Sequence, residues 1–141
     1  MKVKYINNDS SWFFENWQVY NVFAIELSAN KNFYYIDNWI SKYIYWWNTS
    51  DFEIVDSNIS THWKFWINQF WDHVIWPEEV YKMEYFWSNY LEDTSEYQKV
   101  IDKYYGIARN ELFNSVPDWI SEQEKQRRQE AGWEFIDSEN K

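Results

Sequence analysis

The sequence predicts an α+β domain in which an N-terminal antiparallel, hairpin-rich sheet packs against C-terminal amphipathic helices around an aromatic-rich core. Runs of β-branched and aromatic residues recur in the first half, and apolar residues recur at helical spacing in the second half. Aromatic residues make up 24% of the 141 residues, whereas leucine is nearly absent. Because each buried ring removes about 150 to 250 Å² from water, we expect rings to build the core of a single domain over residues 1–141.

The clearest strands lie between residues 19 and 37. The run VYNVFAIEL at residues 19–27 is followed by SANKN and then by FYYID at residues 33–37, which predicts a hairpin. Asn30 and Asn32 are residue types that tolerate the left-handed conformation of a tight turn. A third short strand is expected at residues 52–55.

The stretch THWKFWINQFWDHVIW at residues 61–76 is ambiguous in period. Trp63, Phe65 and Ile67 alternate as on a strand, but several residues also recur at helical spacing, namely Trp63, Trp66, Ile67, Phe70, Trp71 and Val74. We expect a strand in the first part, paired as a hairpin with residues 52–55 around Asp56-Ser57-Asn58. A turn or a helix is expected to follow.

Two amphipathic helices are predicted after this stretch. Pro77, Glu78 and Glu79 form a helix start, since proline suits the first turn and carboxylates face the positive end of the helix dipole. The apolar face of this first helix would be formed by Val80, Met83, Trp87 and Tyr90. A capping box at Ser95-Glu96-Tyr97-Gln98 starts the second, whose stripe is Tyr97, Val100, Ile101, Tyr104, Ala108 and Leu112.

The C-terminal segment SEQEKQRRQEAG predicts a solvated helix. Ser121 and Glu124 form its capping box, Gly132 ends it, and Glu124 is spaced to pair with Arg128. Within residues 119–141, the side chains expected to hold this helix on the domain are Trp119, Trp133, Phe135 and Ile136.

Composition excludes several classes of function. The net charge of −10 and the pI near 4.6 disfavour nucleic-acid and anionic-membrane binding and favour a basic protein partner. The two glycines are too few for a phosphate-binding loop, and the absence of cysteine excludes disulfides and thiolate metal sites. We therefore predict no cofactor. Since no secretory signal or 18-residue apolar run is recognisable, a cytoplasmic location is expected.

Candidate catalytic groups are few. His62 and His73 would lie about 16 Å apart on a helix, so they suit a shared metal poorly. Ser60, His62 and Asp56 can be combined into a nucleophilic triad on paper, but small polar residues at this spacing are typical of turns.

The acidic run of Asp51, Glu53 and Asp56 has three interpretations. An acidic edge strand that resists edge pairing is favoured, followed by a protein-binding patch and then by a magnesium site. Most of the tryptophans should pack in the core, although sugar stacking is an alternative. Adjacent rings such as Trp46 and Trp47 cannot share one face, so some must reach the surface, as in a hot-spot interface.

One part of the chain is similar to a known class of proteins. The run Phe52-Glu53-Ile54-Val55-Asp56 with Ser60 and Trp63, followed by WPEEVYKMEYFWSNYLED, resembles immunity proteins of bacterial polymorphic-toxin and contact-dependent growth inhibition systems over residues 50–95. The resemblance implies a binder of a cognate toxin domain, often a nuclease whose active site is basic.

The predicted function is therefore stoichiometric inhibition of a toxin by a protein without catalytic residues or metal. Steering is assigned to carboxylates and contact to tryptophans; the predicted partner-binding residues are Asp51, Glu53, Asp56, Trp63, Trp71, Asp72, Glu78, Glu79 and Glu84. The partner is a cognate toxin with a basic surface, and neither nucleic acid nor a membrane is expected. The alternatives are an acidic DNA-mimic inhibitor of a nucleic-acid-binding protein and a metal-dependent enzyme.

Overall fold

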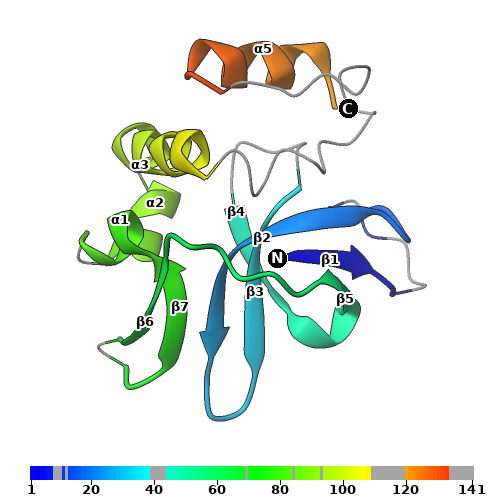
Figure 1. The fold of residues 1–141 in the computed structure, drawn as a ribbon, viewed down its shortest axis with the longest axis vertical. Helices are drawn as coiled ribbons and strands as arrows, with labels where there is room; N and C mark the ends of the chain where they lie inside the picture. The colour runs from blue at the N-terminus through cyan, green and yellow to red at the C-terminus, as the bar shows by residue number, and fades with distance from the viewer. Residues whose placement is uncertain are drawn as a thin grey trace. The chain divides into compact units, whose positions relative to one another are not determined.

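The computed structural model describes residues 1–7, 11, 13–38, 44–68, 70–83, 85–92, 94–108 and 120–133. The chain divides into two compact units, residues 1–78 and residues 79–141. The predicted α+β class is confirmed, since the first unit contains an antiparallel sheet and the second contains helices (Figure 1). The expectation of a single domain stays a prediction.

The described part of the first unit forms a seven-stranded sheet in which every pair of strands is antiparallel. Its strands are β1 (Lys2–Tyr5), β2 (Val19–Leu27), β3 (Asn32–Asp37), β4 (Ile44–Asn48), β5 (Phe52–Asp56), β6 (Trp63–Ile67) and β7 (His73–Pro77). The main order is β4-β3-β2-β1-β5. β3 pairs with one edge of β2. Along the other edge, β1 pairs with the first half of β2 and β7 with its second half, so the sheet branches at β2.

The five-stranded path must be strongly curved. In a flat sheet its edge strands β4 and β5 would lie four spacings apart, roughly 19 Å. They are joined only by η1 (Thr49–Asp51), a single 3₁₀ turn with a rise of about 2 Å per residue. The sheet therefore curls until its two edges approach each other.

Phe14, in the segment between β1 and β2, fills the inside of this curl. Its side chain is 2% exposed, and it contacts rings from β1, β2, β4 and β5. The ring centroids lie 5.3 Å from Tyr5, 5.0 Å from Tyr20, 5.0 Å from Trp47 and 5.2 Å from Phe52. The predicted aromatic core is thus centred on a residue outside any strand.

The predicted strands at residues 19–27, 33–37 and 52–55 are present, but two details of their connections were wrong. Asn30 and Asn32 are not in the left-handed region; hydrogen bonds between Ser28 and Lys31 close the turn instead. β5 pairs with β1 rather than with β6, because Tyr5 opposite Phe52 places both rings in the core. The ambiguous stretch 61–76 contains β6 and most of β7, which pair as a hairpin, and none of its described residues is helical.

The second unit contains α1 (Glu78–Tyr81), α2 (Phe86–Glu92), α3 (Thr94–Ile107) and α5 (Glu122–Glu130). The predicted helix from Pro77 is broken: Pro77 ends β7, α1 is one turn, and Tyr85 lies at φ 54° before α2. The second predicted helix is confirmed as far as Ile107, although it starts at Thr94 rather than after Ser95. Leu112 lies outside the described residues.

The α5 helix is held by a polar and aromatic cluster. Ser121 Oγ accepts the Glu124 amide at 3.1 Å, which confirms the predicted cap, and the predicted Glu124–Arg128 pair forms at 2.7 Å. The prediction of a solvated helix was wrong on one face, because Arg128 is 2% exposed and lies 4.5 Å from the Trp133 ring centroid. Trp133 Nε1 donates to Asp102 on α3 at 2.8 Å.

Trp133 therefore provides the contact that ties α5 to α3, and its ring centroid lies 4.1 Å from that of Tyr105. The other expected contact residues of this segment, Trp119, Phe135 and Ile136, lie outside the described residues. None of the described helices is long and apolar enough to cross a membrane.

Candidate functional site

The acidic residues predicted on the third strand lie on β5 and on the turn before it. β5 is at the end of the main strand order, as the edge-strand interpretation predicted. Asp51 Oδ1 accepts Asn7 Nδ2 at 3.1 Å. Lys4 and Lys2 lie opposite Glu53 and Asp56 in register, so cross-strand attraction offsets part of this negative charge.

The proposed triad residues have local structural roles instead. Asp56 Oδ1 accepts the Asn58 amide at 2.9 Å, and Ser60 Oγ accepts the His62 amide at 3.2 Å. Both are turn contacts, which confirms the alternative interpretation of these residues. Within the ranges that the structure describes, no group of three or more His, Cys, Asp or Glu is placed to hold a metal ion.

The remaining predicted residues differ greatly in exposure. Trp63 is 7% exposed and lies opposite the buried Pro77, so its proposed role as a surface contact was wrong. Glu78 and Glu79 are half-buried at the start of α1, and Glu84 lies outside the described residues. Trp71, in contrast, is 81% exposed.

The structure separates the predicted acidic residues into different regions. Glu53 lies opposite Lys4, which pairs with Val19 at the beginning of β2. Asp72 precedes His73, which pairs with Leu27 at the end of β2. Those ends are eight residues apart, roughly 26 Å of extended strand. The predicted residues therefore do not form one continuous site.

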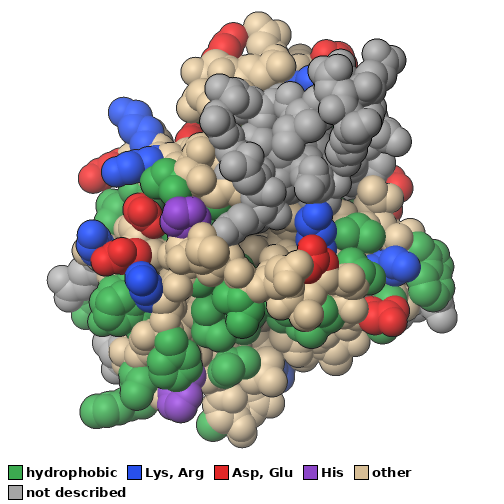
Figure 2. All heavy atoms as spheres, viewed as in Figure 1, with side chains coloured by type: hydrophobic (Ala, Val, Ile, Leu, Met, Phe, Trp, Pro, Cys, Tyr) green, Lys and Arg blue, Asp and Glu red, His purple; other side chains and the backbone are tan. Residues whose placement is uncertain are grey.

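A candidate site emerges at the Asp72 end. It is an exposed apolar surface, the hairpin patch, formed by Leu27, Phe65, Ile67, Phe70 and Trp71. Phe65 and Ile67 lie opposite Ile75 and His73, which in turn lie opposite Ile25 and Leu27, so these side chains share one face of the sheet. Figure 2 shows hydrophobic side chains gathered at the lower left, where Figure 1 places the β6–β7 hairpin. Exposed apolar side chains gathered in one region are typical of interaction sites.

Hydrogen bonds of Asn68 hold the turn between β6 and β7, which carries Phe70 and Trp71. Asn68 Oδ1 accepts the amides of Phe70 at 2.9 Å and Asp72 at 3.0 Å, and the Asn68 amide donates to the Asp72 carbonyl at 3.0 Å. Within this turn Trp71 lies at φ 66°, a left-handed conformation that costs a non-glycine residue about 1 to 2 kcal/mol. The fold thus presents a large ring to solvent on an unfavourable backbone.

A pair of carboxyl groups lies at the same end of β2, with Glu26 on the other face of the sheet from Leu27, because neighbouring residues on a strand alternate. Tyr35 on β3 donates its hydroxyl to Glu26 Oε2 at 2.7 Å. Asp72 lies two residues before Val74, which pairs with Glu26, and its charge acts on the Glu26 carboxyl group. Burial raises the pKa of Glu26 above its ordinary value of 4.5, and the negative charge of Asp72 adds to this effect, whereas the Tyr35 hydrogen bond opposes it. Burial, with the charge of Glu26, likewise raises the pKa of Tyr35.

Sequence reasoning missed Glu26 and Tyr35. The signal was present in the predicted hairpin, because alternation places Glu26 and Tyr35 on the same face of β2 and β3. Asp72 was predicted, but its proximity to Glu26 depends on the pairing of β7 with β2, which no local pattern indicates.

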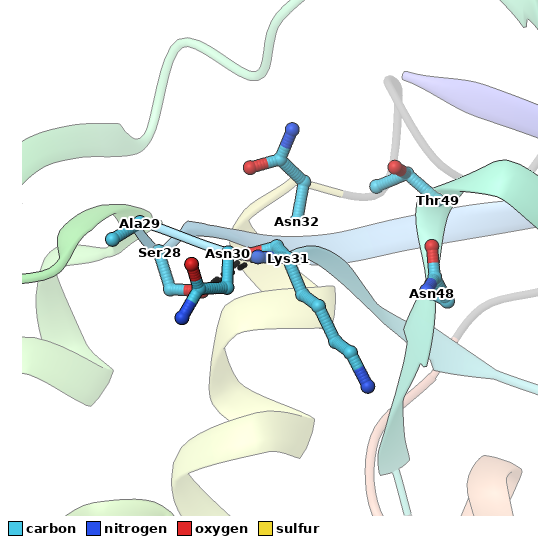
Figure 3. Close-up of a pocket in the computed structure, with 7 residues that line it drawn as sticks. All are labelled: Ser28, Ala29, Asn30, Lys31, Asn32, Asn48 and Thr49. Carbon is cyan, nitrogen blue, oxygen red and sulfur yellow. Dashed lines mark hydrogen bonds between the residues drawn. The ribbon is translucent and has the colours of Figure 1, made fainter.

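A polar depression of about 300 Å³ lies beside the β2–β3 turn (Figure 3). It is lined by residues 28–32, Asn48 and Thr49. The Ser28 hydroxyl is already used in the turn, where it donates to the Lys31 carbonyl. The lining contains amides, hydroxyls and the ammonium group of Lys31, with no carboxylate or imidazole to act with it as an acid–base pair.

Comparison with family models, curated proteins and solved structures finds no match. A function for this chain must therefore be argued from the hairpin patch and from its charges.

Proposed function

We propose that this protein is a non-catalytic inhibitor that binds a bacterial toxin domain with a basic surface, as immunity proteins do. The contact surface is the hairpin patch, and the carboxylates elsewhere on the chain steer the encounter. This assignment keeps Trp71 and Asp72 in the contact surface and omits Trp63, which is buried.

The exposure of Trp71 is the observation that carries this proposal. A ring that is 81% exposed adds little hydrophobic stabilisation to the free protein, and its backbone conformation at φ 66° is costly. Strain of this kind concentrates at functional sites. Trp17 shares this φ and is 61% exposed, but only Trp71 belongs to an apolar patch, with Phe65 and Phe70. Since tryptophan is enriched in binding hot spots, contact with a partner accounts for a ring within this patch.

The charge of the chain supports the choice of partner. A net charge of −10 attracts a cationic protein over several ångströms and raises the association rate, whereas buried rings chiefly slow dissociation. A toxin that acts on nucleic acid carries such a cationic surface, because its substrate is anionic.

The test uses the toxin domain that the neighbouring gene would encode if this protein is an immunity protein. It measures binding to that domain and inhibition of its activity. The purified protein is titrated calorimetrically with that toxin domain, and toxin activity is measured at each ratio. We expect a one-to-one complex and complete inhibition at equivalence. A toxin that stays active, or that does not bind, would contradict the proposal.

A further inference from the structure

We propose that the tip of the β6–β7 hairpin inserts Phe70 and Trp71 into an apolar cleft of the partner, and that a Lys or Arg beside this cleft pairs with Glu26 and Asp72. The inference rests on the proposed function and specifies the partner chemistry that the site requires. It assigns Glu26 and Asn68 to the interface, although neither belongs to the predicted set.

The apolar part of the inference follows from how the hairpin tip is built. Phe70 is 71% exposed, and Asn68 Oδ1 holds the turn that carries Phe70 and Trp71 by accepting hydrogen bonds from the amides of Phe70 and Asp72. Phe70 and Asp72 are therefore tied to Asn68 before binding, which lowers the conformational entropy that these residues lose on insertion. Protruding, pre-organised rings fit a concave partner better than a flat one.

The charged part follows from the neighbourhood of Glu26. The groups that face its carboxyl group are Tyr35 from β3 and Asp72 and Asn68 from the β6–β7 turn. Tyr35 donates one hydrogen bond, but the nearby carboxyl group of Asp72 opposes ionisation of Glu26. An ammonium or guanidinium group placed at the pair would remove this repulsion, so a cation is the chemical complement of the site.

The chain offers a matched control for the ring. Trp17 also lies at φ 66° and is 61% exposed, but it precedes β2, whereas Trp71 lies beside the other end of that strand. Trp17→Gly and Trp71→Gly therefore remove the same side chain from the same backbone conformation at opposite ends of one strand. Glycine has no penalty at positive φ, so both variants should fold at least as stably as the wild type.

The experiment measures the dissociation constant of the full-length variants for the adjacent toxin domain by calorimetry. We expect Trp71→Gly to weaken binding at least about 30-fold, as for a hot-spot residue, and Trp17→Gly to change it less than about 2-fold. Wild-type affinity in Trp71→Gly would overturn the inference and leave the proposed function intact. Absence of binding by the wild type would overturn the proposed function itself.

Glu26→Gln tests the cation. A raised pKa in the folded state means that folding stability falls as the pH rises from 4.5 through the folded pKa of Glu26. Glu26→Gln should remove this loss and be more stable than the wild type at pH 7, as measured by urea unfolding. A partner cation favours ionised Glu26, so wild-type affinity should increase with pH over the same window.

The glutamine variant should bind about tenfold more weakly at pH 7, and the affinity gain that the wild type shows over this pH window should be absent. If Glu26→Gln is more stable than the wild type but binds more weakly, its weaker binding cannot result from loss of structure, so Glu26 acts at the interface. A stabilised Glu26→Gln variant with unchanged affinity at every pH would overturn the cationic part of the inference.

Discussion

At the residue scale, Arg128 shows how one charge can organise the second unit. Its guanidinium is buried, pairs with Glu124 at 2.7 Å and covers the Trp133 ring. A buried ion pair is not a large source of stability by itself, because both charges lose their hydration. Loss of one partner is nevertheless costly, since the other charge is then left buried.

We therefore predict that Arg128→Ala lowers the free energy of unfolding by about 3 kcal/mol, at the low end for a broken buried pair because Arg127 still donates to Glu124 at 2.9 Å. Arg127→Ala is the matched control, since its side chain is partly exposed, and it should cost less than about 1 kcal/mol. Urea unfolding followed by fluorescence measures both. Equal losses in the two variants would argue against a dominant role for Arg128.

At the scale of elements, the segment between β1 and β2 is part of the core rather than a simple connection. Phe14 lies in this segment and contacts rings from strands at both edges of the curved path, Trp47 on β4 and Phe52 on β5. A buried ring outside the strands therefore helps to stabilise the curvature that η1 requires.

The prediction is that Phe14→Ala destabilises the protein by about 3 to 5 kcal/mol, since a large buried ring is replaced by a cavity. Phe70→Ala removes the same side chain from an exposed position, and its cost should be within about 0.5 kcal/mol. Thermal unfolding of both variants gives the comparison. A small effect of Phe14→Ala would mean that the curved sheet does not depend on this ring.

At the scale of the whole molecule, the negative charge and the hairpin patch have separable effects. Glu53 and Asp56 lie on β5, and Asp51 immediately precedes it. β5 is joined through β1 to the beginning of β2, whereas Trp71 lies beside the end of β2. Charges outside a contact surface act on the encounter over a distance, and that action is screened by salt. Asp51, Glu53 and Asp56 would thus contribute to association without touching the partner.

Substitution of all three, as Asp51→Asn, Glu53→Gln and Asp56→Asn, should slow association with the toxin domain several-fold at low salt and leave dissociation unchanged. The difference should disappear near 1 M salt, where the screening length is about 3 Å. Stopped-flow tryptophan fluorescence measures both rates. Faster dissociation of the triple variant would instead place these residues in the contact surface.

Features that depend on neighbouring residues were predictable from the sequence. Runs rich in β-branched and aromatic residues predicted β2 and β3, and helical spacing predicted α3. The cap at Ser121 and the Glu124–Arg128 pair were predictable because their partners lie within one turn of a helix. Such interactions are encoded in the order of a few residues.

Strand pairing and the exposure of individual rings, in contrast, emerge only in the folded chain. β1 and β5 pair across most of the length of the first unit, and β7 joins β2 from a distant part of the chain, so the proximity of Asp72 to Glu26 has no local signature. Trp63 and Trp71 occur in the same aromatic run, but Trp63 is buried at the start of β6, whereas Trp71 is exposed in a turn. Burial depends on the packing of remote segments, and a residue's immediate neighbours do not specify it.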